Sequence, residues 1–195
     1  MNRLTTRVAI VGAGPVGLCL ANLLGAEGIA TLLLERNPGP HPLPRAQTMD
    51  DEGLRTLQAI GLAERFLPMT LRAEGSQYFD AHGDCFARIG PGDEPYGFAR
   101  RNYMRQERLD ALLLDGLARH ASVDTRFGTE IVTLEQDARG VRLHGRDAHG
   151  PLQVEADYVL ACDGGRSRLR EALGIRMQGW TYAQDWIVLD ALDDP

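Results

Sequence analysis

The chain has 195 residues, of which 44% are hydrophobic and 25% are charged, so it can bury a sizeable core. Its formal net charge is −6, and all 21 basic residues are Arg. They form no basic stripe, which argues against duplex nucleic acid as a partner. No apolar run reaches the roughly 18–20 residues that span a bilayer, and the N-terminus lacks the apolar segment of a secretory signal. We therefore expect a cytoplasmic protein that binds neither nucleic acid nor membrane.

The cysteines and histidines form no metal-binding pattern. Cys19, Cys85 and Cys162 are odd in number, widely spaced and without a CxxC pair, which disfavours both disulfides and zinc. The five histidines are scattered along the chain without ligand spacing. We predict no metal site.

The first 35 residues have the pattern of a βαβ unit. A short apolar strand is predicted over 7–11, a helix from Pro15, and a second strand over 30–35 whose continuous apolar run is typical of a parallel strand covered on both faces. Pro15 suits the first helical turn, where its missing N–H is not needed. The apolar residues expected on the inward face of this helix are Val16, Leu20, Leu23 and Leu24.

The next segment alternates between loops and short elements. Residues 37–47 are rich in Pro and predict an extended loop. A helix is expected over 50–60 and a shorter helical run over 62–67. Residues 76–89 have the pattern of a β-hairpin around a turn.

The following segment predicts a long helix and then a run of strands. Leucines at helical spacing mark an amphipathic helix over 106–120, and a strand is expected over 123–127. Turns at 137–140 and 147–150 separate three strand-like stretches, which predict a β-meander. A buried strand is then expected over 157–162.

Two further elements are predicted before the sequence ends. Residues 167–173 suit a short helix, and residues 185–192 have the pattern of a strand. Such a strand would be an unpaired edge, which folded proteins usually avoid. We therefore expect that the sequence is part of a longer protein.

A glycine motif lies between the first strand and the first helix. Gly12-Ala-Gly14-Pro-Val-Gly17 matches GxGxxG. In this context Gly12 permits a tight turn, Gly14 lets the backbone approach a pyrophosphate, and Gly17 lets the helix pack against the strand. The pyrophosphate would meet the free N–H groups of the helix N-terminus. The alternative is that the glycines serve only as turn residues.

The second strand ends at Glu35, 23 positions after Gly12. A carboxylate there can accept hydrogen bonds from ribose hydroxyls and would repel a 2′-phosphate, so the bound adenosine should not belong to NADP. Arg36 is expected to lie along the adenine or to pair with a phosphate. These residues predict a dinucleotide site, but they do not separate FAD from NAD.

A second motif near residue 160 carries a family resemblance. The apolar run 157–162 leads into Asp163-Gly164, with Ser167 and Arg170 at fixed offsets. This resembles the second fingerprint of FAD-dependent aromatic hydroxylases. With the N-terminal GAGPVG and the Pro-Arg-Ala at 44–46, the whole chain resembles the N-terminal part of group A flavoprotein monooxygenases of the para-hydroxybenzoate hydroxylase fold. Within that group it is most similar to the 3-(3-hydroxyphenyl)propionate hydroxylases.

The resemblance implies roles at matching positions. Arg45 would reach the flavin phosphate or ribityl chain, Gln106 would contact the ribityl–flavin region, and Asp163 would be associated with FAD and with NAD(P)H docking. Each residue also has an alternative role without cofactor contact. Arg45 would be a solvated loop charge, Gln106 would begin a helix, and Asp163 would be a helix N-cap. We expect Arg168 to be solvated. The predicted cofactor-binding residues are Gly12, Gly14, Pro15, Val16, Gly17, Glu35, Arg36, Arg45, Gln106, Asp163 and Gly164.

The resemblance also implies an activity. The family uses FAD, NADH or NADPH, and O2 to hydroxylate a small aromatic substrate. Because the cofactor does the difficult chemistry, we name no catalytic residue in this chain. The alternative is a non-catalytic FAD-binding fragment or decayed gene product. A two-dinucleotide reductase would need a redox CxxxxC or a second GxGxxG after residue 130, and the sequence has neither.

The expected fold class is α/β. We predict a Rossmann-like FAD-binding domain over 1–75 and 104–177, built from a parallel sheet with helices and a β-meander. Residues 76–103 and 178–195 are expected to supply strands that begin a β-sheet substrate domain.

Overall fold

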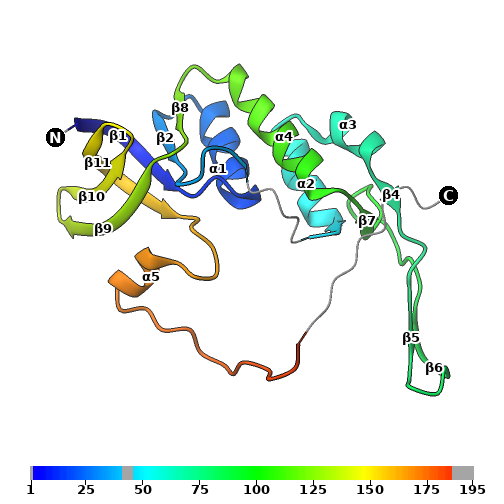
Figure 1. Cartoon of the computed structure of the whole chain (residues 1–195). Coiled ribbons are helices and arrows are strands. Elements are labelled where there is room, and N and C mark those ends of the chain that lie inside the picture. The colour runs from blue at the N-terminus through cyan, green and yellow to red at the C-terminus, as the bar shows by residue number, and fades with distance from the viewer. Residues whose placement is uncertain (1, 41–45, 186–195) are drawn as a thin grey trace.

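A computed structural model describes residues 2–40 and 46–185 of the chain (Figure 1). Its main feature is a six-stranded sheet in the order β8-β2-β1-β11-β10-β9. β8, β2, β1 and β11 are parallel to one another, whereas β10 and β9 continue the sheet antiparallel. The strand bounds are β1 Asn2–Val11, β2 Thr31–Leu34, β8 Val123–Arg126, β9 Glu130–Asp137, β10 Gly140–Asp147 and β11 Gly150–Ala161.

The strand β11 joins the parallel sheet to the meander. Its first half pairs with β10 on one side, from Asp147↔Gly150 to Val141↔Ala156, while its whole length pairs with β1 on the other. The sequence predicted two strands here, a third meander strand and a separate buried strand over 157–162. This was wrong: they form one strand, and Tyr158 within its second half is 65% exposed.

Alternate residues of β1 face two different hydrophobic clusters. Val8 and Ile10 pack with the helices, whereas Ala9 and Val11 pack with β2 and the meander. This period of two is what a strand covered on both faces requires. The site described below lies at the carboxyl end of this strand.

The helix α1 (Pro15–Ala26) buries its small residues. Gly17, Ala21 and Gly25 follow one another at four-residue spacing, and all three are buried. A Cβ on Gly25 would lie 2.6 Å from the His120 ring. Because there is no room for a larger side chain here, the buried face of α1 carries small residues. The predicted inward face was therefore partly wrong: Val16 is 65% exposed, and the other three predicted residues are half-buried.

The helix α4 (Gln106–Gly116) packs beside α1, and the 3-10 turn η2 (Leu117–Arg119) extends it. The predicted apolar stripe is confirmed, since its four leucines are at most 7% exposed. The Arg119 side chain links the end of α4 to Ile60 by donating to the carbonyl oxygens of Gly116 (3.0 Å) and Ile60 (2.9 Å).

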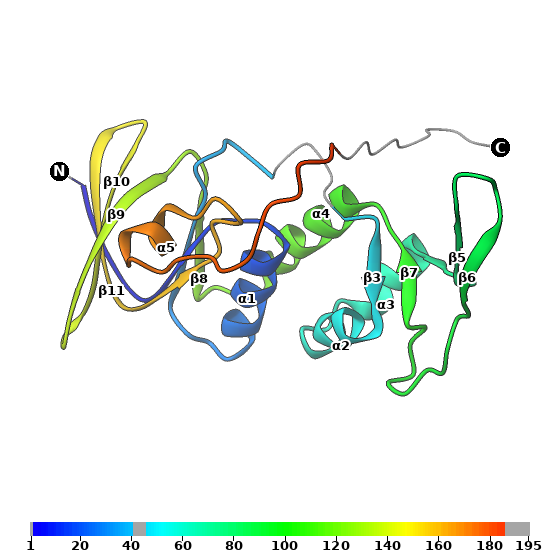
Figure 2. The same ribbon diagram turned by 90° about the horizontal axis from the view of Figure 1, so that it is seen from below.

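Two shorter helices complete the helical layer (Figure 2). α2 (Asp51–Ala59) begins at Asp50, whose carboxylate accepts from the Gly53 N–H at 2.7 Å. α3 (Ala63–Phe66) leads into the 3-10 turn η1 (Leu67–Met69). Leu54, Leu57 and Ile60 are buried as predicted.

Two small sheets lie at the other end of the molecule from the meander (Figure 1). One has three strands in the order β3-β7-β4, and the other is the predicted hairpin, β5 with β6. The hairpin projects from the body, and its aromatic residues are exposed: Tyr78 44%, Phe79 56% and Phe86 70%. The bounds are β3 Thr48–Asp50, β4 Leu71–Arg72, β5 Ser76–Phe79, β6 Cys85–Ile89 and β7 Arg101–Tyr103.

The last described element is the short helix α5 (Arg168–Ala172), which begins at Ser167. The Ser167 hydroxyl accepts from the Arg170 N–H at 3.0 Å, as an N-cap residue does. The strand predicted over 185–192 lies outside the described residues except for its first position. None of the described helices is long and apolar enough to cross a membrane.

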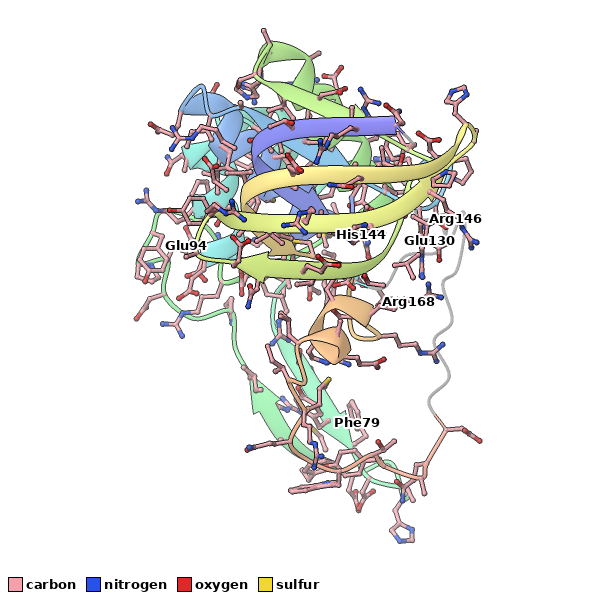
Figure 3. All side chains as sticks on the ribbon, turned by 90° about the vertical axis from the view of Figure 1, so that its left-hand side faces the viewer. Phe79, Glu94, Glu130, His144, Arg146 and Arg168 are labelled. Atoms are coloured by element: carbon pink, nitrogen blue, oxygen red, sulfur yellow. The ribbon has the colours of Figure 1, made fainter. Side chains whose placement is uncertain are left out.

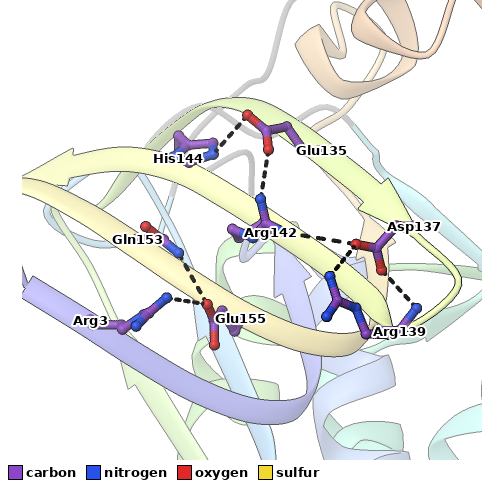
Figure 4. A network of polar contacts seen from close by, with 8 residues as sticks. All are labelled: Arg3, Glu135, Asp137, Arg139, Arg142, His144, Gln153 and Glu155. Atoms are coloured by element: carbon purple, nitrogen blue, oxygen red, sulfur yellow. Dashed lines mark hydrogen bonds and ion pairs between the residues drawn. The ribbon is translucent and has the colours of Figure 1, made fainter.

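The meander carries a polar network on its surface (Figure 4). Glu135 accepts from Arg142 at 2.8 Å and lies 3.4 Å from His144. Glu155 accepts from Arg3 at 2.6 Å. Acidic and basic side chains alternate here, which is typical of a solvated, salt-bridged sheet face.

Candidate cofactor site

A pocket of about 380 Å³ opens at the carboxyl ends of β1, β2 and β11. Ligands bind at this edge of open α/β sheets, because the turns there present free backbone groups. Among the residues that line it are nine of the predicted positions: Gly12, Gly14, Pro15, Val16, Glu35, Arg36, Gln106, Asp163 and Gly164. Arg45 lies outside the described residues.

The turn after β1 requires glycine at two positions. Gly12 has φ +106°, and its N–H donates to the Leu34 carbonyl oxygen at 2.7 Å. A Cβ there would lie 2.3 Å from the Cys162 carbonyl oxygen. A Cβ on Gly17 would lie 1.9 Å from the Gly12 carbonyl oxygen, so Gly17 supports the turn from beneath rather than lining the pocket.

The N-terminus of α1 faces the pocket without a side-chain cap. Gly14 is the N-cap residue, and no side chain accepts from the first N–H groups of the helix. A Cβ on Gly14 would meet no atom within 4 Å, because it would project into open space beside the helix end. Uncapped N–H groups and the positive end of the helix dipole suit a phosphate.

Glu35 is held by backbone and side-chain donors at the end of β2. One carboxylate oxygen accepts from the Ala13 N–H at 2.9 Å, and the other accepts from the N–H and side-chain amide of Asn37 at 2.9 and 2.7 Å. These bonds fix the carboxylate beside the Gly12 turn. Because two carboxylate oxygens offer about four lone pairs, the group retains acceptor capacity for a hydroxyl.

Gln106 joins the start of α4 to the loop that precedes β3. Its side chain is 4% exposed, and its amide oxygen accepts from the Ala46 N–H at 2.9 Å. Its side-chain N–H donates to Asp110 at 3.2 Å. Gln106 therefore positions the residue next to Arg45 on the pocket wall, a structural task that the sequence did not indicate.

Asp163 places a buried carboxylate at the far side of the pocket. One oxygen accepts from the Leu169 N–H at 3.3 Å, and Ser167 is the N-cap of α5, so the predicted N-cap alternative for Asp163 is replaced by a longer-range contact. The other oxygen is buried and has no hydrogen-bond partner among the described residues. A buried acceptor without a partner is uncommon in folded proteins, so this oxygen is available to a donor on a ligand. Gly164 follows with φ +84°.

The pocket wall also contains charged residues that the sequence analysis missed. Glu130 lies at the start of β9 and accepts from Arg146 at 2.6 Å and from Arg168 at 2.8 Å (Figure 3). The bond from Arg146, with the charges of both Arg residues, lowers the pKa of Glu130. Arg168 is 54% exposed, as expected of a solvated residue, but it also pairs with Glu130. That partner lies 38 positions away on another element, and no local pattern indicates it.

The cysteines near the site are suited to packing. Burial, and then the charge of Asp110, raise the pKa of the Cys19 thiol to about 11. Burial, and then the charge of Asp163, raise the pKa of Cys162. Both thiols therefore stay protonated and unreactive near neutral pH. In the described part of the chain, no three His, Cys, Asp or Glu side chains gather as metal ligands would.

A βαβ turn, an uncapped helix N-terminus and an acidic end to the second strand define a dinucleotide-binding protein. A family model described as an FAD binding domain matches residues 5–195, and the chain belongs to that family.

Curated relatives narrow the class. The chain is 45% identical over its whole length to the 3-(3-hydroxy-phenyl)propionate/3-hydroxycinnamic acid hydroxylase of Burkholderia cenocepacia, and it covers 37% of that protein. It is 42% identical, over 96% of its length, to the enzyme of the same name from Mycolicibacterium smegmatis, of which it covers 34%. The chain thus spans about a third of the length of these relatives.

Solved structures agree with this placement. The chain superposes on p-nitrophenol 4-monooxygenase PnpA from Pseudomonas putida with a TM-score of 0.84 at 25% identity, covering 94% of this chain and 47% of that one. For the flavin-dependent monooxygenase PieE, solved with FAD and substrate, the TM-score is 0.81 at 29% identity, covering 92% and 34%. The predicted α/β class and the resemblance to flavin-dependent aromatic hydroxylases are confirmed, with FAD as the cofactor of the family.

Proposed function

We propose that the pocket at the carboxyl ends of β1, β2 and β11 holds the adenosine and diphosphate part of FAD. The observation that carries this proposal is the uncapped N-terminus of α1 beside Gly14, in one pocket with the unpartnered oxygen of Asp163. The first suits a phosphate, and the second requires a hydroxyl or N–H donor. FAD carries both groups, so the residues present fit it.

Each residue is assigned to the part of FAD that its chemistry suits. The diphosphate would lie against Gly14, Pro15 and Val16 and would accept from the free N–H groups at the start of α1, of which Pro15 supplies none. Glu35 would accept from a ribose hydroxyl, and Arg36 would lie along the adenine. Asp163 and Gly164, on the opposite wall, would face the ribityl side, where Gln106 and Arg45 are proposed to approach the flavin.

FAD would supply the redox chemistry, taking a hydride from NADH or NADPH and reacting in reduced form with O2. The part of this chain is to bind and orient the cofactor. The deep pocket wall at Cys162 and Asp163 would shield the sugar and phosphate bonds from water. No described side chain is assigned a proton-transfer role.

For the whole protein, we infer hydroxylation of a small aromatic substrate. The support is the 45% identity to hydroxylases whose names specify 3-(3-hydroxyphenyl)propionate and 3-hydroxycinnamic acid. The substrate would lie partly against residues outside this chain. Residues 76–103 and 178–195 are proposed to belong to a substrate domain, which is supported by the projecting hairpin and its exposed aromatic side chains. The cytoplasmic location stays a prediction from the sequence.

The test is a titration of the chain with FAD, followed by flavin fluorescence. We expect saturable binding that Gly14→Val abolishes, because its side chain would occupy the space for the diphosphate. Gly90→Val is the matched control, since a Cβ on Gly90 also meets nothing within 4 Å but lies away from the pocket. Equal binding by both variants would contradict the proposal.

A separate measurement decides whether the chain is only a non-catalytic FAD-binding fragment. If the chain is only a cofactor-binding unit, NAD(P)H oxidation will not depend on added aromatic substrate. Substrate-dependent oxidation with stoichiometric hydroxylated product would instead show that the chain is catalytically complete.

A further inference from the structure

Glu130 links three elements at one wall of the pocket (Figure 3). It lies on β9, accepts from Arg146 on β10 at 2.6 Å, and accepts from Arg168 on α5 at 2.8 Å. Its side chain is 21% exposed, whereas the two Arg side chains are 70% and 54% exposed. The carboxylate is therefore the fixed centre of the group.

The backbone on either side of Glu130 is anchored. The N–H of Thr129 donates to the Glu35 carbonyl oxygen at 2.8 Å, and Thr129 is 3% exposed. Ile131 is 7% exposed and packs in the hydrophobic cluster that β1 and β2 share with the meander strands. Glu130 thus shares a rigid frame with Glu35, which we have placed at the adenosine end of the ligand.

The loop from Asp163 to Ser167 is hydrogen-bonded to α5. Asp163 accepts from the Leu169 N–H, Ser167 accepts from the Arg170 N–H, and Arg170 donates to the Gly165 carbonyl oxygen at 2.8 Å. All these bonds are internal to residues 163–170. They give the loop its shape, but they do not fix it relative to the rest of the pocket.

The loop continues directly from β11, where the Cys162 N–H donates to the Val11 carbonyl oxygen at 2.8 Å. Beyond it, side-chain contacts attach α5 to the sheet. Leu169 is 1% exposed and packs in the core cluster, and Arg168 pairs with Glu130. Apolar packing is non-directional, so the buried leucine holds the helix down without setting its rotation. The ion pair supplies a direction.

We propose that Arg168 is a positioning residue that acts through Glu130. It fixes the Asp163 loop against the strand frame that carries Glu35, and so sets the spacing between the two ends of the cofactor pocket. This inference rests on the proposed FAD site. Arg168 does not touch the cofactor in this account, so a charge of either sign serves at position 168 provided that position 130 carries the opposite charge and position 146 the same charge as 168.

The experiment is a charge-reversal cycle in the whole chain, with FAD affinity measured by fluorescence at low salt. The variants are Arg168→Ala, Arg168→Glu, Glu130→Arg, and the triple variant Glu130→Arg with Arg146→Glu and Arg168→Glu, which reverses all three charges because Glu130 also pairs with Arg146. Arg139→Glu is the matched control, because Arg139 pairs with Asp137 on the same meander at 3.5 Å but does not line the cofactor pocket.

We expect Arg168→Ala to weaken FAD binding about two- to fivefold, as the loss of an exposed ion pair implies. Either single reversal should weaken binding more, and the triple variant should recover most of the loss. Added salt should reduce these differences, and Arg139→Glu should leave the affinity unchanged. A triple variant that binds as weakly as Arg168→Glu alone would overturn the proposal, since it would mean that Arg168 contacts the cofactor directly.

A second readout needs no cofactor. Amide hydrogen exchange over residues 163–170 should be faster in Arg168→Glu than in the unsubstituted chain and should slow again in the triple variant. If the unsubstituted chain does not bind FAD, the proposed function fails, and the exchange measurement still decides the role of Arg168. Unchanged exchange in Arg168→Glu would overturn that role even if FAD binds.

Discussion

At the scale of single residues, the glycines of the first turn have different tasks that stability can separate. Gly17→Ala places a Cβ 1.9 Å from the Gly12 carbonyl oxygen. We expect the free energy of unfolding to fall by about 1–3 kcal/mol, as overpacking costs. Gly14→Ala meets no atom within 4 Å, so its effect on stability should stay within about 1 kcal/mol.

Urea unfolding of the two variants measures this difference. If Gly14→Ala destabilises the chain as much as Gly17→Ala, the close packing described for Gly17 is not the reason for the motif's third glycine.

Asp163 should matter more for binding than for stability. Asp163→Ala removes one bond from the Leu169 N–H and an oxygen that accepts no bond among the described residues. We expect the free energy of unfolding to change by less than about 1 kcal/mol, while FAD affinity falls about tenfold or more because a bond to a charged acceptor is lost. Calorimetric titration and urea unfolding check the two parts. A large loss of stability with unchanged affinity would assign Asp163 to the fold alone.

At the scale of elements, the contact between β9 and α5 should depend on pH. Arg146 and Arg168 lower the pKa of Glu130 in the folded chain. The ionised carboxylate therefore stabilises the fold above its unfolded pKa of about 4.3, and this contribution disappears as the pH falls through the lower folded pKa.

Glu130→Gln removes this dependence. We expect the variant to be less stable than the unsubstituted chain near neutral pH and to approach it at acidic pH, where Glu130 is protonated in both states. Urea unfolding across the acidic range measures the difference. A gap that is constant with pH would contradict the ion-pair account.

The elements also show which structural features are readable from sequence. Local signals predicted most of them: Pro15 begins α1, Gly61 follows α2, and the leucine stripe of α4 is buried. The inward face of α1 was partly misassigned because the period of large apolar residues ignores close approach. Gly17, Ala21 and Gly25 are buried because they are small. Gly25 packs against His120, which is remote in sequence.

The site residues also fall into those that local motifs predict and those that they do not. The turn glycines, Glu35 and the Asp163-Gly164 pair lie in local motifs that the sequence shows. Nine of the eleven predicted cofactor-binding positions line the pocket. Glu130 and Arg168 were missed, because their role depends on β9 and α5 meeting in space. No spacing rule connects two residues that pair across 38 positions.

At the scale of the whole molecule, the described surface carries apolar groups far from the pocket. On the hairpin, Phe79 and Phe86 are 56% and 70% exposed, and exposed aromatic side chains are typical of contact surfaces. We expect the chain to self-associate, and Phe79→Ser with Phe86→Ser to reduce association without changing FAD affinity. Light scattering against concentration measures this. Unchanged association would show that the hairpin is not the contact.

The central claim is that one pocket, between the Gly12 turn and the Asp163 loop, holds FAD. Amide hydrogen exchange of the chain with and without saturating FAD tests it most directly, because it reports where the ligand lies. We predict slower exchange over residues 12–18, 35–37 and 163–169 when FAD is bound, and no change over the hairpin at 76–89. Saturable binding with protection confined to other segments would contradict the account.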